Sequence, residues 1–220
     1  MTRPWKSLAT ADTDEGKLEL RRRGDSEFLI VIGGRVLMNS ASRRSEEALA
    51  TLACAHLKAA SAPHVLIGGL GMAFTLRAAL DAVPATARVV VAELNAVIID
   101  WCRGPLAAST GNAAADPRVR IEHGDVAVVI AAAKPASYDA IILDLYEGPN
   151  AATQRGDDPF YSAAALDRQH RALRPGGVLA VWSEDADAAF AKRMAARFTL
   201  TTHRIGGGGR RHVVYVGTRS

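Results

Sequence analysis

Four apolar runs of this sequence each end in glycines or an acid: Gly68-Gly69-Leu70-Gly71, Glu93, Gly124-Asp125 and Asp144. Glycines let backbone N–H groups approach a ligand closely, and the start of a helix offers that ligand a positive dipole. An acid about 22 residues after such glycines is typical of proteins that hold ribose hydroxyl groups. Each feature alone also fits a tight turn, a helix cap or a solvated loop acid. Their succession predicts a nucleoside-binding site.

Motifs of several other functions are incomplete. From Gly69 the chain reads G-L-G-M-A-F, so Phe74 stands at the third glycine of a dinucleotide fingerprint, which disfavours NAD and FAD. No G-K-[ST] follows these glycines, and the chain has no G-x-S-x-G or H-E-x-x-H motif. The two cysteines, Cys54 and Cys102, make neither a disulfide framework nor a zinc site. We therefore expect no bound metal.

Strands and helices alternate from residue 63 onward. We expect strands at residues 64–67, 88–92, 118–121, 138–143 and 178–182, and helices at 72–82, 96–107, 126–133, 159–173 and 186–196. Residues 198–203 and 212–216, joined across 206–209, predict a closing antiparallel hairpin. The pattern predicts an α/β fold: a Rossmann-like, doubly wound, seven-stranded, mostly parallel sheet that ends in this hairpin. Ligands of such sheets bind beyond the carboxyl ends of the strands.

Residues 1–60 predict a smaller N-terminal unit, followed by a main domain at 61–220. The extended runs 28–32 and 35–38 are joined by Gly33-Gly34, which is typical of a β-hairpin. A helix is expected from Ser45 to about residue 60. Ser45 can cap it, and Glu46 and Glu47 lie in its first turn, where the helix dipole favours acids.

The composition fits a soluble globular protein, with 49% hydrophobic and 23% charged residues. No apolar run reaches the ~18 residues of a membrane span, and the N-terminus lacks the apolar stretch of a signal peptide. We therefore expect a cytoplasmic protein with no membrane partner. The formal charge is +4, but the arginines are scattered and no aromatic side chains accompany them, which disfavours nucleic acid as a partner.

The motifs resemble those of class I S-adenosylmethionine-dependent methyltransferases, and most closely the spermidine synthase (aminopropyltransferase) branch. The matching stretches stand in family order over roughly residues 60–185: HVLIGGLG at 64–71, VVVAELN at 89–95, VRIEHGD at 119–125, YDAIILD at 138–144 and LRPGGVL at 173–179. The N-terminal hairpin and helix also look like that branch's N-terminal region.

This resemblance implies S-adenosylmethionine, or its decarboxylated form, as the cofactor. It assigns the cofactor site to Gly68, Gly69, Gly71, Glu93, Leu94, Asp125, Val126 and Asp144. The glycine loop would run against the methionine part, Glu93 would hold the ribose hydroxyls, and Asp125 would accept a hydrogen bond from the adenine amino group.

Catalysis would rest on Asp144, with Glu147 as a second acid. Asp144 aligns with the acid that orients and deprotonates the attacking amine in aminopropyltransferases, a step suited to a carboxylate at a strand end. The branch usually has D-[ST]-[ST]-D-P where this chain has D-L-Y-E-G-P at 144–149. A Tyr-His-Glu run expected near the N-terminal helix is absent, and E-E-A-L at 46–49 occupies that region.

These departures favour methyl transfer. We therefore expect a spermidine synthase-like transferase that passes a methyl group to a small-molecule acceptor such as an amine. Aminopropyl transfer from the decarboxylated cofactor remains an alternative, as does a non-catalytic adenosyl-binding protein. An RNA methyltransferase is a third possibility, and steeply salt-dependent RNA binding would reveal it. The resemblance also implies a homodimer.

Overall fold

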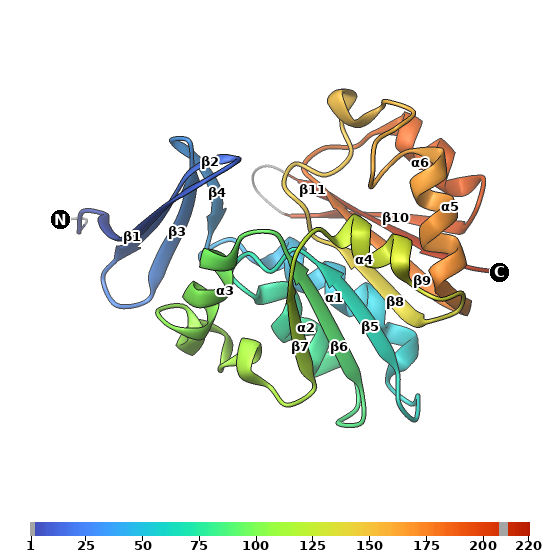
Figure 1. The fold of residues 1–220 in the computed structure, drawn as a ribbon, viewed down its shortest axis with the longest axis horizontal. Helices are drawn as coiled ribbons and strands as arrows, with labels where there is room; N and C mark the ends of the chain where they lie inside the picture. The colour runs from blue at the N-terminus through green and yellow to red at the C-terminus, as the bar shows by residue number, and fades with distance from the viewer. Residues whose placement is uncertain (1–2, 207–210) are drawn as a thin grey trace.

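A computed structural model describes residues 3–206 and 211–220 of the chain, which form two sheets (Figure 1). The small sheet contains β1 (Lys6–Thr13), β2 (Gly16–Arg23), β3 (Glu27–Ile32) and β4 (Arg35–Asn39). The large sheet contains β5 (His64–Gly68), β6 (Arg88–Glu93), β7 (Val119–His123), β8 (Tyr138–Leu143), β9 (Leu173–Ser183), β10 (Thr199–Ile205) and β11 (His212–Thr218).

The helices lie along and between these strands. They are α1 (Arg44–Cys54), α2 (Phe74–Ala82), α3 (Ala96–Arg103), α4 (Val126–Ala132), α5 (Ala163–Ala172) and α6 (Ala188–Ala195), with short 3₁₀ turns η1 (Ala55–Leu57), η2 (Ala107–Thr110), η3 (Ala113–Ala115) and η4 (Ala151–Thr153). Within the described ranges, no helix is both long and apolar enough to cross a membrane.

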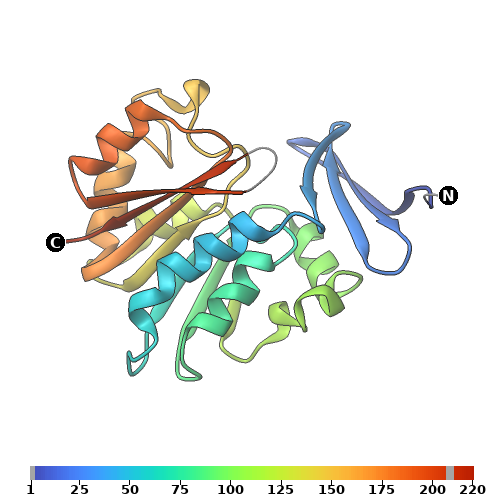
Figure 2. The same ribbon diagram turned by 180° about the vertical axis from the view of Figure 1, so that it is seen from behind.

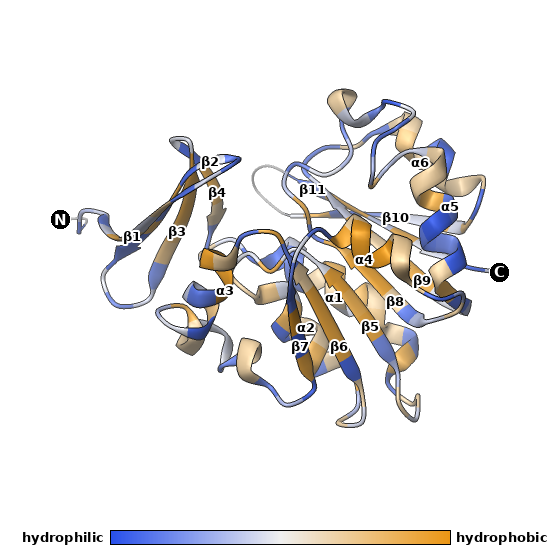
Figure 3. Ribbon diagram, in the orientation of Figure 1, coloured by the Kyte–Doolittle hydropathy of each residue, from blue (hydrophilic) through white to orange (hydrophobic). Residues whose placement is uncertain are grey.

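The large sheet confirms the predicted fold class. Its order is β10-β11-β9-β8-β5-β6-β7; β9, β8, β5, β6 and β7 run parallel, and β11 pairs antiparallel with both β9 and β10. Helices α4, α5 and α6 lie in front of the sheet in Figure 1, whereas α1 and α2 cover the opposite face in Figure 2. Figure 3 colours β5, β6 and β8 mostly as hydrophobic, as expected of strands buried on both faces. The predicted turn at 206–209 falls mostly outside the described residues.

The strand order places a topological switch between β5 and β8. From β5 the chain moves outward to β6 and β7, then returns to form β8 on the other side of β5. Ligand sites of open α/β sheets form at such a switch, beyond the carboxyl ends of the strands. The end of β5 and the end of β8 are therefore neighbours in the structure.

The small sheet contains the predicted hairpin, β3 and β4, within a meander of four antiparallel strands. Its face toward the large sheet is apolar: Leu18, Leu20, Phe28 and Ile30 are buried and share one hydrophobic cluster with Met72, which follows β5. Burial of this face fixes the small sheet beside the large one.

Helix α1 packs against α2 and against strands β8, β9 and β11 of the large sheet. Its start differs from the prediction. Arg43 is the N-cap residue and no side chain caps the helix; the Ser45 hydroxyl instead donates a hydrogen bond to Glu46. The predicted division at residue 60 stays a prediction, although α1 lies against the large sheet.

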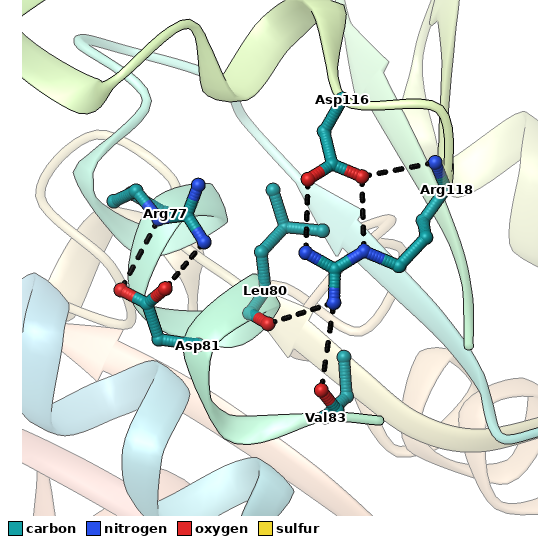
Figure 4. Close-up of polar contacts among 6 residues, drawn as sticks. All are labelled: Arg77, Leu80, Asp81, Val83, Asp116 and Arg118. Atoms are coloured by element: carbon teal, nitrogen blue, oxygen red, sulfur yellow. Dashed lines mark hydrogen bonds and ion pairs between the residues drawn. The ribbon is translucent and has the colours of Figure 1, made fainter. Parts of the chain in front are cut away.

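A polar cluster joins the start of β7, the edge strand of the large sheet, to the end of α2 (Figure 4). Arg118, just before β7, donates to both carboxylate oxygens of Asp116 at 2.9 Å and to the carbonyl oxygens of Leu80 and Val83 at the end of α2. The guanidinium therefore satisfies carbonyls that the end of a helix leaves without partners. It also holds the pKa of Asp116 at about 2.

Candidate functional site

The glycine loop after β5 lies directly against the end of β8. The Asp144 N–H donates to the Gly68 carbonyl at 2.9 Å, and the Gly69 N–H donates to the Ala92 carbonyl at 2.9 Å. Gly69 has φ +87°, and a Cβ atom on it would overlap the backbone carbonyl oxygen of Asp144. Only glycine therefore fits at Gly69 without moving β8.

The neighbouring glycines are equally close to other parts of the chain. A Cβ atom on Gly71 would overlap the sulfur of Met38, a residue of β4. A Cβ atom on Gly68 would lie 2.9 Å from the methyl groups of Val126, a buried residue at the start of α4. The loop is thus enclosed by β4, α4 and the end of β8.

Glu93, at the end of β6, ties two loops of the site together. Its side chain is only 7% exposed; one carboxylate oxygen accepts from the Leu70 N–H and the other from the Asn95 N–H, both at 2.8 Å. Burial is the main cause of the raised pKa of Glu93, and these N–H groups oppose it. The Gly71 N–H also stabilises this carboxylate, and because its two oxygens offer about four acceptor sites, it can still accept from a hydroxyl group.

Asp125 and Leu94 lie at the ends of neighbouring strands. Asp125 caps α4, because its Oδ1 accepts from the Ala127 N–H at 2.8 Å. Leu94 is 53% exposed, and its carbonyl oxygen lies 3.0 Å from His123 Nε2. Asp125 is therefore a helix cap, which is one of the roles that its position in the sequence allowed. Within the described ranges, its second oxygen, Oδ2, accepts no hydrogen bond.

Asp144 lies at the end of β8 and is half-buried. The Thr75 hydroxyl, from the first turn of α2, donates to Asp144 Oδ2 at 2.5 Å. Burial, and to a smaller extent the nearby Glu46 carboxylate, raise the pKa of Asp144 to about 7, and the Thr75 hydrogen bond opposes both effects. Asp144 therefore has the proton affinity of a general base that works near neutral pH.

Glu46 is a site residue that the sequence analysis missed, having treated it only as a first-turn acid of a helix. It is buried, 9% exposed, in the first turn of α1. A signal was present: Glu46 stands three, four and seven residues before the buried positions 49, 50 and 53, so it lies on the apolar stripe of its helix.

Among the described residues, no hydrogen bond joins the Glu147 side chain to Asp144. Its Oε1 accepts from the Arg35 guanidinium of β4 at 2.7 Å, and Oε2 accepts from Asn150 at 3.3 Å. The same guanidinium lies over the Tyr146 ring, 5.4 Å from its centre. Arg35, which the sequence analysis also missed, thus links the small sheet to the loop after β8.

The edge of the sheet beyond β8 and β9 carries an acidic hollow of about 320 Å³. Its lining includes Glu147, Asn150, Glu184, Asp185 and Asp187. A larger hollow of about 490 Å³ lies along α1 and α2 and contains none of the predicted site residues. The acidic hollow therefore adjoins the candidate site, whereas the larger one does not.

Curated proteins match this chain in sequence, although no model of a known protein family matches it. The chain is 37% identical over 134 residues to putrescine N-methyltransferase 1 from Nicotiana tabacum, covering 59% of this chain and 33% of the relative. It is 30% identical over 168 residues to polyamine aminopropyltransferase from Mycobacterium tuberculosis, covering 75% and 30%. The chain spans about a third of the length of these relatives.

Solved structures share the fold. A spermidine synthase from Thermotoga maritima is 18% identical with a TM-score of 0.77, covering 98% of this chain and 73% of that one. A spermidine synthase in complex with the transition-state analogue AdoDATO is 19% identical with a TM-score of 0.78, covering 98% and 74%. The resemblance to the spermidine synthase branch, inferred from the motifs, is confirmed.

Proposed function

We propose that this chain is a transferase that takes a methyl group from S-adenosylmethionine and passes it to the amine of a small molecule. One observation carries the proposal: Asp144, a carboxylate whose pKa is about 7, lies at the topological switch against the glycine loop. A base there can accept a proton from an amine held beside the cofactor.

The chemistry of the surrounding residues fits an adenosyl sulfonium. Glu93 is held by backbone N–H groups and keeps lone pairs for the ribose hydroxyls, and Asp125 Oδ2 is available to the adenine amino group. The exposed side chain of Leu94 and the buried Val126 offer apolar contact to the adenine ring. Bound there, the cofactor would supply a carbon bonded to a positively charged sulfur.

Asp144 prepares the acceptor for attack on that carbon. An alkylammonium has a pKa of about 10.4 and cannot attack while it is protonated. A pKa of about 7, in place of the ordinary 3.8, brings Asp144 roughly 4 kcal/mol closer to the proton affinity of such an amine. Asp144 can take the ammonium proton on a carboxylate oxygen, which leaves the nitrogen lone pair free to attack. With the cofactor bound, the new nitrogen–carbon bond would replace the carbon–sulfur bond, whose electrons would stay on sulfur, so the product amine would carry the positive charge.

Methyl transfer is supported by the match to putrescine N-methyltransferase 1, which is 37% identical over 134 residues. The aminopropyltransferase relatives match either over a shorter stretch, 39% over 70 residues for spermidine synthase 1 from Pisum sativum, or at a lower identity, 30% over 168 residues for the Mycobacterium tuberculosis enzyme. Because the first relative acts on putrescine, we propose a short diamine as the acceptor. A cytoplasmic location and a homodimer remain predictions.

Mass spectrometry of the products tests this function. The purified chain is incubated with putrescine and either S-adenosylmethionine or its decarboxylated form, with Asp144→Asn as the inactive control. We expect a methylated diamine from the first cofactor only. Formation of spermidine from the decarboxylated cofactor would show that the chain transfers an aminopropyl group and not a methyl group. Tight cofactor binding without any product, across a panel of amines, would favour the non-catalytic alternative.

A further inference from the structure

Two carboxylates lie where α1 packs against α2 and β8: the buried Glu46, in the first turn of α1, and the half-buried Asp144, directly after β8. Asp144 accepts from the Thr75 hydroxyl at 2.5 Å, and Glu46 accepts from the Ser45 hydroxyl at 2.7 Å. The start of α1 lies against the start of α2, because the guanidinium of Arg43, the N-cap residue of α1, lies 5.6 Å from the centre of the Phe74 ring. Thr75, the next residue of α2, contacts Asp144, so the first turn of α1 lies close to the end of β8. Each carboxylate thus has one neutral hydroxyl donor.

Neither carboxylate has a counter-ion among the residues at 3–206 and 211–220. The arginines at the start of α1 and on α2 do not serve: Arg43 pairs with Glu47 at 3.0 Å, Arg77 pairs with Asp81, and Arg44 is exposed whereas Glu46 is buried. Buried charges are ordinarily paired, and two like charges that share a site raise the proton affinity of one of them.

The remaining groups that face Asp144 do not supply a positive charge. Tyr161, from the segment before α5, is 3% exposed, and its hydroxyl has no hydrogen-bond partner in the described part of the chain. Burial, together with the charges of Asp158 and Asp144, raises the pKa of Tyr161, so it stays neutral. Thr75 is uncharged. The electrostatic balance at Asp144 is therefore set mainly by burial and by Glu46.

We infer that Glu46 is a positioning residue that acts through Asp144: its buried, uncompensated charge keeps Asp144 basic enough to take the proton of a cationic acceptor. The catalytic role of Glu46 rests on the proposed function, whereas its effect on Asp144 can be measured without any activity. Glu46 lies outside the motifs that suggested the function, and its effect is a property of the free protein.

Carbon-13 NMR titration of the aspartate side chains tests the inference directly. The Asp144 signal is assigned by its loss in Asp144→Asn, and its midpoint is compared in the wild type, Glu46→Gln and Glu47→Gln. Glu47 is the matched control, because it is the adjacent acid in the same helical turn and is paired with Arg43. We expect Glu46→Gln to lower the midpoint by on the order of one pH unit, and Glu47→Gln to leave it unchanged. Equal midpoints in all three proteins would overturn the inference.

Thr75→Val supplies an independent variant that probes the same carboxyl from the other side. It removes the hydrogen bond that stabilises the ionised form, so the Asp144 midpoint should rise. If Glu46→Gln does not fold, the wild type and this variant still decide. A wild-type midpoint near the ordinary aspartate value, with no rise in Thr75→Val, would overturn the inference.

The pH dependence of turnover separates this inference from the proposed function. If the midpoint falls from about 7 to about 6 in Glu46→Gln, the ionised fraction of Asp144 at pH 6 rises about fivefold. The acid limb of the pH profile of kcat/KM should move by the same number of pH units as the NMR midpoint. In Glu47→Gln the acid limb should stay where it is in the wild type. A shifted NMR midpoint in a protein without activity would contradict the function alone. An active enzyme with an unshifted acid limb in Glu46→Gln would contradict the role of Glu46.

Discussion

Replacing Gly69 with alanine should destabilise the protein through Asp144, the residue beside it. Gly69 has φ +87°, where a side chain costs roughly 1–2 kcal/mol by backbone strain alone. The new Cβ atom would also overlap the Asp144 carbonyl oxygen, a backbone atom at the end of β8 that cannot rotate away. Overpacking of this kind adds typically ~1–3 kcal/mol.

Gly176 is the matched control for this experiment. Its φ of +76° is nearly the same, but a Cβ atom there would meet no atom within 4 Å. Gly176→Ala therefore measures the backbone strain without the overlap. For a protein of this size, 1 kcal/mol corresponds to roughly 2–4 °C in Tm. We expect Gly69→Ala to lose roughly 2–12 °C more than Gly176→Ala.

Thermal unfolding followed by circular dichroism, together with urea denaturation, measures both variants. Turnover gives a second reading, because Asp144 must move when its carbonyl is displaced, so Gly69→Ala should also lose activity at temperatures where it remains folded. Equal losses of stability in the two variants would refute the close approach of Gly69 to Asp144. A stable, fully active Gly69→Ala variant would show that the glycine loop is an ordinary turn without a role in the site.

Three further substitutions follow from the same contacts. Glu93→Gln turns an amide NH₂ toward one of two backbone N–H groups, so it should cost roughly 1–3 kcal/mol in urea denaturation; wild-type stability would contradict this. Asp144→Asn should lower turnover roughly 10²–10⁴-fold. It should also raise Tm by more at pH 8 than at pH 4, because the folded-state pKa is raised and the wild type loses stability as pH rises from about 4 to about 7; an unchanged difference across this range would contradict it. Arg118→Ala should lower stability by roughly 2–4 kcal/mol at pH 7. That loss should shrink as pH falls from about 4 to 2, where Asp116 becomes protonated in the wild type; a constant loss would exclude the ion pair as its cause.

The central strands of the large sheet were predictable because they are buried on both faces and therefore form short apolar runs. Residues 138–143 coincide with β8. Helix ends were less predictable, since capping and local breaks set them. Helix α3 ends at Arg103, before Gly104 and Pro105, and α5 begins only at Ala163, where the Ser162 hydroxyl accepts from the Ala165 N–H.

The first strand was not predictable from its own residues. Lys6–Thr13 is a polar edge strand with mostly exposed side chains, and it has no apolar alternation that would mark it. Its conformation depends on pairing with β2, which places Lys6 opposite Arg22 and Thr13 opposite Gly16. Such pairing is a tertiary property that a local pattern does not contain.

The candidate site was predictable where it follows from strand ends, and not where it depends on packing from elsewhere. Parallel strands end at one edge, so the glycine loop, Glu93 and Asp144 were expected to be neighbours. Glu46 and Arg35 reach that edge from α1 and β4, which the motif pattern does not include. Glu147, predicted as a second acid, is engaged by Arg35, and its catalytic role stays a prediction.

Isothermal titration with S-adenosylmethionine tests the central claim most directly, namely that the carboxyl ends of β5 to β8 bind an adenosyl sulfonium. We predict saturable one-to-one binding to the wild type, weakened about tenfold or more by Glu93→Gln, which corresponds to ~1.4 kcal/mol or more. Asp144→Asn should change the affinity little, because its role is in proton transfer. The absence of saturable binding by S-adenosylmethionine, its decarboxylated form and 5′-methylthioadenosine would contradict the account.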